Sequence, residues 1–392
     1  MTTDVIPSGF EGLSLVPARG RTPTRLVGIE EELLLFDAVT FEPVASADAI
    51  VGPTTSRVCT PSGTLLEREV KGEQIEVVSR PVLTFDQILQ TVVDGRRAAD
   101  AAAREVGARA VALATAPVLC ETHLISDARY ERMSERFGLT MVEQLTCGFH
   151  VHVDVRSRHE GVAILDRIRP WLPVLLAVSA NSPFWRGVDS AFASYRYQAW
   201  GRWPSAGPYD PFGSVAAYDE MVAQMVATGV ALDPGMIYFD ARLSHHVPTV
   251  EIRIADVCLV PEDAAVLAAL VRALVETAAQ EWAAGVPFDD TPTTVLRLSS
   301  WLASRGGVTG ELLHPVTLTP RPAVEAVAAL LDHVKLGFAS PAEAARVRAG
   351  VGDILRRGTG ADLQRRAMAA AGSAEGVVRD AAARTVAPPF AA

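Results

Sequence analysis

Residues 149–155 of this 392-residue chain read FHVHVDV, and this stretch decides what kind of structure the sequence forms. Apolar and polar residues alternate along it, which is typical of a β-strand with one face in the core. Residues 249–257, TVEIRIADV, repeat the pattern over much of their length. We therefore expect both stretches to be strands of a sheet that has one polar face.

The alternation also decides which polar side chains can meet, because residues two apart in a strand share a face. In the first stretch His150 and His152 lie on the polar side, opposite Val151. In the second stretch Glu251 and Arg253 share the polar side. Imidazole, carboxylate and guanidinium groups are therefore expected on the same face of the sheet.

A third strand is predicted over residues 27–35, VGIEEELLL. Its alternation places Glu30 and Glu32 together on the polar side, whereas Glu31 shares the apolar side and is expected near the edge of that side. Residues 74–79, QIEVVS, form a further strand candidate between Gly72 and Pro81.

Each polar pair also has an ordinary structural explanation. The two glutamates could form a solvated face, H-x-H could be a plain polar face, and Glu251 with Arg253 could take part in cross-strand ion pairing. The joint occurrence favours a site, because glutamate is disfavoured in strands and three strands carry these groups. Carboxylates suit Mg²⁺ or Mn²⁺, imidazole can complete the shell, and arginine binds phosphate or carboxylate through two parallel hydrogen bonds.

Helical patterns surround these strands. Thr84 is expected to cap a helix, and Pro261 to start a long alanine-rich helix that runs toward Gly285. Residues 109–115 are β-compatible, and the chain beyond residue 291 reads as helical. Breaks in that region are expected near 306–310 and 315–322. The pattern predicts an α+β fold with an antiparallel sheet and a helical C-terminal region.

Three segments follow from this pattern. Residues 1–24, rich in proline and glycine, are expected to form a flexible N-terminal arm, and residues 376–392 a C-terminal tail. Residues 25–375 are expected to form a single domain.

Composition limits the function classes. The chain has 46 acidic and 36 basic residues, which disfavours a nucleic-acid or anionic-membrane surface. Its only lysines are Lys71 and Lys335, so anionic substrates must be held by arginine, metal or backbone amides. The four scattered cysteines indicate reduced thiols, and the sequence shows neither a signal peptide nor a membrane span, which predicts a cytoplasmic protein.

Residues 180–207 combine arginines and aromatic residues more densely than the rest of the chain. Arg186, Arg196 and Arg202 alternate there with tryptophans and a tyrosine, an arrangement suited to holding an anion beside a flat group. The alternative is an ordered loop whose aromatic side chains fill the core. The sequence contains no Walker-type phosphate loop, no dinucleotide-binding glycine motif and no serine nucleophile elbow.

Six blocks of the sequence, taken together and in order, resemble the glutamate–cysteine ligase type 2 family of carboxylate–amine ligases. They spread over nearly the whole chain, and each alone is weak. The blocks are VGIEEELLLFD (27–37), QIEVVS (74–79), CGFHVHVDV (147–155), ANSPFWRGVDSAFASYR (180–196), PTVEIRIADVC (248–258) and GTGADLQRR (358–366).

The resemblance implies a glutamine-synthetase-like fold, in which a curved antiparallel sheet surrounds the active site and helices lie outside. It implies an ATP-dependent ligase that needs Mg²⁺ or Mn²⁺ and forms an amide through an acyl phosphate. By resemblance the metal ligands are Glu30, Glu32, Glu76, His150 and Glu251.

The remaining assignments also come from the resemblance. Arg196 and Arg253 would be the catalytic arginines that contact phosphate or the acid, and the nucleotide would be bound by a wider set of residues. That set is His150, His152, Arg196, Arg253 and Arg202. The partners are a small-molecule acid and amine, with no nucleic acid or membrane, and homo-oligomerisation is left open.

Two alternatives remain at this point. The ligase could act on an acid and amine other than glutamate and cysteine, as in specialised metabolism. A metal-dependent amidohydrolase could instead use His150 and His152 with His245, His246 and Asp256, although this leaves Glu30 and Glu32 unexplained. A non-catalytic binding protein on the same fold should have lost these carboxylates, which are intact here.

Overall fold

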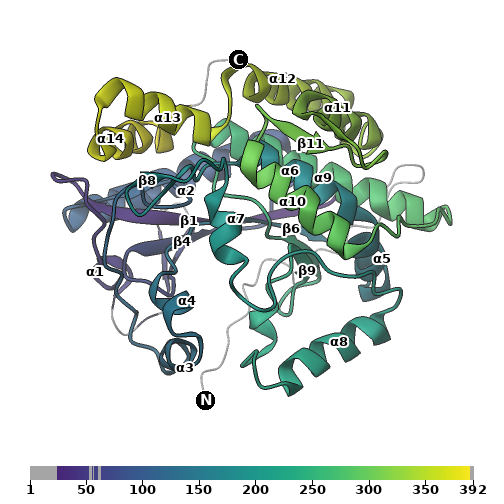
Figure 1. Cartoon of the computed structure of the whole chain (residues 1–392), viewed down its shortest axis with the longest axis horizontal. Coiled ribbons are helices and arrows are strands. Elements are labelled where there is room, and N and C mark those ends of the chain that lie inside the picture. Colours follow the sequence, from purple (N-terminus) through teal and green to yellow (C-terminus); the bar gives the residue numbers. More distant parts are fainter. Residues whose placement is uncertain (1–23, 53–54, 56, 61–62, 389–392) are drawn as a thin grey trace.

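The computed structural model describes residues 24–52, 55, 57–60 and 63–388. The predicted flexible arm therefore lies outside the described residues, apart from residue 24. The described part begins in the core, where Arg25 forms buried ion pairs with Glu160 and Glu276. Figure 1 shows one large sheet across the middle of the molecule, with helices on both of its sides.

The large sheet is antiparallel and has eight strands, as the α+β prediction requires. Its order is β2-β3-β4-β1-β6-β10-β9, and β5 also pairs with β1. The strands are β1 (Val27–Asp37), β2 (Arg57–Cys59), β3 (Leu65–Arg68), β4 (Gln74–Val78), β5 (Ala108–Val111), β6 (Phe149–Asp154), β9 (Ala241–Leu243) and β10 (Thr249–Ile252).

The first strand of the chain is the centre of the sheet. β1 pairs with β4 along one edge and with β6 along the other, and its C-terminal half also pairs with β5. In this register Glu30 is opposite His150, and Glu32 is opposite Glu76. Because paired residues point to the same face, the polar sides of the three strands coincide.

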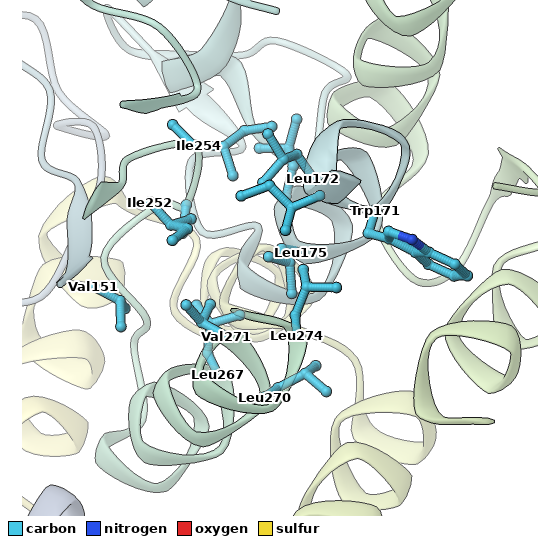
Figure 2. Packing of buried hydrophobic residues seen from close by; sticks show 14 of the residues in the cluster. Val151, Trp171, Leu172, Leu175, Ile252, Ile254, Leu267, Leu270, Val271 and Leu274 are labelled. Atoms are coloured by element: carbon cyan, nitrogen blue, oxygen red, sulfur yellow. The ribbon is translucent and has the colours of Figure 1, made fainter. Parts of the chain in front are cut away.

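Two long helices cover the apolar face. They are α2 (Phe85–Glu105) and α9 (Pro261–Ala283), which pack on each other and on the central strands. Thr84 caps α2 with a capping box, and Pro261 begins α9, as predicted. Figure 2 shows the core where α9 and the segment 171–175 meet β6 and β10. The labelled side chains there are Val151, Trp171, Leu172, Leu175, Ile252, Ile254, Leu267, Leu270, Val271 and Leu274.

The other helices lie around this centre. Figure 1 shows the C-terminal helices beyond α9, on the side of the apolar face, and α3, α4 and α8 on the opposite side. These helices are α1 (Ala47–Val51), α3 (Ala128–Phe137), α4 (Leu139–Val142), α5 (Arg158–Ile168), α6 (Leu172–Ser179), α7 (Tyr195–Trp200), α8 (Val215–Ala227), α10 (Thr293–Gly306), α11 (Ala323–His333), α12 (Pro341–Arg357), α13 (Gly360–Ala371) and α14 (Ala374–Thr385), with 3₁₀ turns at Arg169–Trp171 and Pro234–Met236.

The structure corrects two predictions and adds detail to a third. The strand expected over 249–257 ends at Ile252, and an isolated bridge between Asp256 and Gly148 continues the pairing beyond it. The breaks expected near 306–310 and 315–322 are confirmed, because α10 ends at Gly306 and α11 begins at Ala323. The chain between these helices also forms a two-stranded ladder that was not predicted, of β11 (Glu311–Leu313) and β12 (Pro320–Pro322). The tail expected over 376–392 is helical up to Thr385, because α14 has a buried apolar face that packs on the core.

Two further short strands, β7 (Phe184–Trp185) and β8 (Val188–Asp189), pair with each other inside the aromatic-rich segment. Along the described residues, no helix combines the length and the apolar character that a membrane crossing would need.

Candidate metal–nucleotide site

A row of carboxylates runs across the polar face of the central strands. Glu30 and Glu32 extend from β1, and Glu76 extends from β4 opposite Glu32. The structure thus brings together three of the predicted metal ligands. Glu32 is also fixed by its backbone surroundings, because the N–H of Gly148 donates to Oε2 of Glu32 over 2.6 Å.

Two more glutamates extend the row and were missed from the sequence. Glu67 is opposite Glu76 in the pairing of β3 with β4, and Glu69 follows at the end of β3. The two are spaced like Glu30 and Glu32, so the repeated E-x-E spacing in LEREV was the available signal.

The carboxylates repel one another. Burial raises the pKa of Glu76 well above its usual value, and the charges of Glu30 and Glu69 add to the shift. Burial and the charge of Glu32 raise the pKa of Glu69 to about 8. Burial also raises the pKa of Glu67. This row contains more negative charge than its protein neighbours neutralise, which is the electrostatic signature of a cation site.

The two histidines complete the row on the β6 side. Nδ1 of His150 lies 3.2 Å from Oε2 of Glu30, and Nε2 of His152 lies 3.2 Å from its Oε1. Burial, followed by the charge of Arg253, lowers the pKa of His150. Burial alone would lower the pKa of His152 as well, but the carboxylate of Glu30 outweighs it and the pKa is raised.

Glu251 ends the row and is flanked by arginines. Nε of Arg242 donates to Oε2 of Glu251 over 2.7 Å, and Arg253 donates to Oε1. Burial would raise the pKa of Glu251, but Arg253 and Arg242 outweigh it and the pKa is well below its usual value. The cross-strand ion pair considered in the sequence is therefore present, with Arg242 as the residue opposite Glu251.

Three overlapping groups of side chains could hold a cation. In each group, one ligand atom per residue lies within 4.8 Å of the others. All five predicted metal ligands belong to these groups, and His152 and Glu69 join them. The groups are Glu30, His152 and Glu251; Glu30, Glu76 and His150; and Glu32, Glu69 and Glu76. Their oxygen-rich composition with two imidazoles fits Mg²⁺ or Mn²⁺.

Arg196 lies beside this row. A Cβ atom on Gly148 would stand 2.3 Å from Nη2 of Arg196 and 3.0 Å from Nε2 of His150, so only glycine leaves room for the guanidinium there. Nη2 of Arg196 also donates to the carbonyl of Arg253 over 3.3 Å. The two predicted catalytic arginines therefore lie next to each other and next to the carboxylates.

Both arginines keep a buried donor without a partner. Nε of Arg196 and Nε of Arg253 make no hydrogen bond to the described residues. Buried donors normally have partners, so these two N–H groups leave hydrogen-bonding capacity unused beside the carboxylate row.

Arg202, predicted for nucleotide binding, is placed differently. Its guanidinium pairs with Glu143 over 2.6 Å and lies 5.9 Å from the ring centre of Trp185. Arg186 pairs with the same glutamate. The structure therefore joins Arg202 to a surface cluster and shows no contact with the carboxylate row.

Glu31 is the third glutamate of β1 and lies on the opposite face. The expectation that it lies near the edge was wrong, because its exposure is only 1%. Its carboxylate accepts hydrogen bonds from Nε and Nη2 of the fully buried Arg96, which extends from α2. No local pattern points to this partner, which lies 65 residues further along the chain.

The amidohydrolase set is not assembled in the described part of the chain. His245 and His246 are exposed in the turn between β9 and β10. Asp256 is fully buried and accepts hydrogen bonds from Ser182 and Ser194 instead. No group of metal-binding side chains among the described residues joins these three to His150 and His152.

Comparison with known proteins agrees with this geometry. The model of the family described as glutamate-cysteine ligase family 2 matches residues 26–384. A Paenarthrobacter aurescens (strain TC1) protein, provisionally named glutamate–cysteine ligase 2-1, is 52% identical over 351 residues, which cover 89% of this chain and 91% of the relative. A Streptomyces avermitilis protein with the same provisional name is 47% identical over 361 residues, covering 92% and 99%.

Solved structures share the fold at low sequence identity. A glutamate–cysteine ligase from Francisella tularensis, crystallised in complex with AMP, has a TM-score of 0.67 at 12% identity and covers 95% of this chain and 91% of its own. A bifunctional glutathione synthetase from Pasteurella multocida has a TM-score of 0.65 at 15% identity, covering 93% and 52%. Both comparisons support the predicted fold.

Proposed function

The chain belongs to glutamate–cysteine ligase family 2, a family of ATP-dependent carboxylate–amine ligases, and on this premise we propose that its carboxylate row is the metal–ATP site of amide formation. One observation carries the proposal. The predicted metal ligands lie in groups compact enough for each to hold one cation, directly beside Arg196 and Arg253. These ligands are Glu30, Glu32, Glu76, His150 and Glu251.

The carboxylates would hold the divalent cations. Glu32, Glu69 and Glu76 form an all-carboxylate group at the β3–β4 end, and Glu30 with His150 joins the two ends of the row. Bound Mg²⁺ or Mn²⁺ would neutralise negative charge on the ATP phosphates and on the phosphoryl group in transfer.

Arg196 and Arg253 would bind the transferred phosphoryl group or the acid substrate. Each has a buried Nε–H without a partner among the described residues. Arg253 donates to Glu251 of the row, and Arg196 lies next to Arg253 and His150. A fixed guanidinium stabilises negative charge where it develops, and it needs no reorganisation during the reaction. Because burial is deep, these charges act in a medium that screens them weakly.

The chemistry proceeds in two displacements. An oxygen of the acid's carboxylate attacks the γ-phosphorus of ATP, the bond from that phosphorus to the β–γ bridging oxygen breaks, and ADP leaves. The amine nitrogen then attacks the carbonyl carbon of the acyl phosphate, the carbon–oxygen bond breaks, and phosphate leaves as the nitrogen loses a proton. The protein positions the reactants and keeps out water that would hydrolyse the acyl phosphate.

The names of the relatives suggest glutamate as the acid and cysteine as the amine, and we propose this pair first. A ligase for another acid and amine is the second candidate, because the described site specifies charge and metal binding more closely than it specifies substrate side chains.

The reaction class is tested with purified protein, ATP and Mg²⁺, using a panel of acids and amines that includes glutamate and cysteine. Phosphate release and product mass are recorded for each pair. We expect phosphate release that requires both an acid and the metal, with an amide product of the matching mass. Metal-dependent amide hydrolysis in the absence of ATP would overturn the proposal.

The site assignment is tested with Glu30→Gln and Glu251→Gln. We expect turnover to fall by roughly 10²-fold or more, because each change removes a ligand charge. Each change also removes a buried ion-pair partner of arginine or histidine, so the metal-free variants should unfold at a lower temperature, and activity is compared below that temperature. Glu105→Gln, an exposed glutamate at the end of α2, is the matched control and should behave as the unmodified protein. Activity close to that of the unmodified protein in both variants would place the metal site elsewhere.

A further inference from the structure

One block of the sequence has no role in the site described so far. Residues 358–366, GTGADLQRR, lead into α13, which Figure 1 places among the outer helices, on the opposite side of the sheet from α3 and α4. The contacts of this block nevertheless lead step by step to the catalytic arginine Arg196.

The first step joins α13 to Asn181. Nε2 of the buried Gln364 donates both to the carbonyl of Asn181, over 2.8 Å, and to its Oδ1, over 2.7 Å. Gly360 allows this approach, because a Cβ atom there would lie 2.0 Å from Oδ1 of Asn181. Asn181 itself is fully buried, and its Nδ2 donates to the carbonyls of Ala112 and Val257.

The second step joins Asn181 to Asp256. The backbone N–H of Asn181 donates to Oδ2 of Asp256 over 2.8 Å, and the Ser182 hydroxyl donates to the same oxygen over 2.7 Å. The Ser194 hydroxyl donates to Oδ1 over 2.8 Å. The Asp256 carboxylate, with 0% exposure, is therefore held in one orientation by three donors.

The third step joins Asp256 to Arg196. Nη1 of Arg196 lies 3.8 Å from Oδ1 of Asp256, and no other carboxylate of the described chain lies within 4 Å of this guanidinium. The backbone N–H of Arg196 also donates to the Ser182 hydroxyl over 2.9 Å. The guanidinium also makes long hydrogen bonds to the carbonyls of Ile254 and Arg253, at 3.3 Å each, and lies 5.9 Å from the ring centre of Trp200.

The charge of Asp256 stabilises the guanidinium of Arg196, because that guanidinium is buried. A buried guanidinium without an anion carries a large desolvation cost, and its long side chain would be free to turn toward the carboxylate row. Two weak bonds to carbonyls fix the plane of the group less firmly than an oriented carboxylate does.

We propose that Asp256 is a positioning residue for Arg196 and that Gln364 of α13 supports it through Asn181. This proposal rests on the function proposed above, in which Arg196 contacts the phosphoryl group or the acid. The C-terminal block thereby acts on the chemistry from the far side of the sheet, without contacting a substrate.

The main test is Asp256→Asn, which keeps the size of the side chain and removes its charge. Values of kcat/KM are measured for ATP and for the acid, and the same is done for Arg196→Lys. We expect Asp256→Asn to lower kcat/KM by about 10- to 100-fold, the range typical of residues that orient an active-site group. The decrease should fall on the same substrate as the decrease caused by Arg196→Lys.

The double variant separates positioning from general damage. If Asp256 acts through Arg196, adding Asp256→Asn to Arg196→Lys should lower kcat/KM much less than the product of the single effects. Asp166→Asn is the matched control, because this buried aspartate orients the backbone at Phe212 and Gly213, away from the site. It should leave the ratio between the two substrates unchanged.

The outcomes distinguish the two proposals. If Arg196→Lys leaves both kcat/KM values unchanged, the proposed role of Arg196 fails. If Arg196→Lys lowers one value while Asp256→Asn is silent, strictly multiplicative or acts on the other substrate, the positioning proposal fails and the proposed function stands.

Gln364 provides a second route if Asp256→Asn does not fold. Gln364→Met removes the donor but keeps the length of the side chain, and Gln364→Glu places a carboxylate against two acceptor oxygens of Asn181. We expect a smaller loss than for Asp256→Asn, on the same substrate, with Gln364→Glu the more severe. The exposed Gln280→Glu on α9 is the control. Unchanged kinetics in both Gln364 variants would remove α13 from the proposal.

Discussion

Neighbouring glutamates on the two faces of β1 have opposite electrostatic surroundings. On one face Glu31 is almost fully buried, and Arg96 neutralises it with several hydrogen bonds. On the other face Glu30 and Glu32 belong to a row of carboxylates in which Glu69 and Glu76 have raised pKa values. Against the effect of burial, His152 and His150 lower the pKa of Glu30, so the charge without a protein counterpart lies at the β3–β4 end of the row, around Glu69 and Glu76.

The difference separates structural acids from functional acids. A buried carboxylate with its own arginine contributes to a specific fold and needs nothing from outside. Carboxylates that raise one another's pKa destabilise the metal-free protein, and a bound cation relieves them. The same residue type, in three consecutive positions, thus has two different roles because the faces of a strand alternate.

The largest expected change in stability comes from removing the ion pair between Arg96 and Glu31. Arg96→Met should lower the free energy of unfolding by about 3–5 kcal/mol, because Glu31 is left buried and without its counterion. The carbonyls of Cys258 and Leu259 lose a donor as well. Urea unfolding measured with and without Mg²⁺ gives this value, and the metal should not restore the loss.

A double variant checks the cause. Arg96→Met combined with Glu31→Leu removes both charges, so part of the lost stability should return. If the double variant is no more stable than Arg96→Met alone, the loss comes from the two carbonyls and not from the unpaired carboxylate.

A smaller change in the free energy of unfolding is expected when a metal ion binds to the carboxylate row on the other face. Saturating Mg²⁺ or Mn²⁺ should raise the free energy of unfolding of the unmodified protein, by about 2.7 kcal/mol at a hundredfold excess over Kd. Glu76→Gln should lose most of this gain, yet it should be as stable as the unmodified protein without metal, because repulsion within the row is relieved. Thermal melts with a metal titration measure both quantities, and an equal gain in the variant would contradict the assignment.

The last expected effect concerns protons bound at Glu69. Because the folded-state pKa of Glu69 is about 8, compared with 4.5 for a free glutamate, the metal-free folded protein binds more protons than the unfolded chain between these values. Its free energy of unfolding should therefore fall as the pH rises from about 4.5 to 8. Metal binding needs the ionised carboxylate, so it should release protons and tighten as the pH rises, by at most about tenfold per pH unit for each proton.

Calorimetry in buffers of different ionisation enthalpy measures this proton release. Glu69→Gln should release fewer protons at pH 7 than the unmodified protein does. Equal release would show that Glu69 is already ionised before the metal binds.

Local patterns predicted most of the central sheet and the covering helices. β1, β4 and β6 follow the alternation of their side chains, and the capping box at Thr84 marks the start of α2. The end of β10 at Ile252 could not be predicted, because buried apolar residues continue beyond it and the pairing goes on only as an isolated bridge between Asp256 and Gly148. The helical α14 was missed because its few apolar positions are separated by small and charged residues.

Site residues could be predicted where the spacing within a single strand places them on the same face. Glu30, Glu32, His150 and Glu251 were found because their spacing shows that they share a face. Glu69 repeats the same spacing but lies beyond the end of a short strand, and its role depends on pairing between β3 and β4. The Arg96 partner of Glu31 and the Asp256 partner of Arg196 depend on tertiary packing, which no local pattern encodes.

The place of β1 in the sheet has a consequence for the growing chain. This strand is synthesised before all its neighbours, and residues 38–148 must be added before its partner β6 begins. At about 5–20 residues per second, that takes on the order of ten seconds on a ribosome. During this interval residues 27–31 of β1 have no β6 to cover their edge, so nascent chains of the same protein compete for it. Chaperone binding early in translation is therefore expected to decide how much of this enzyme reaches the folded state.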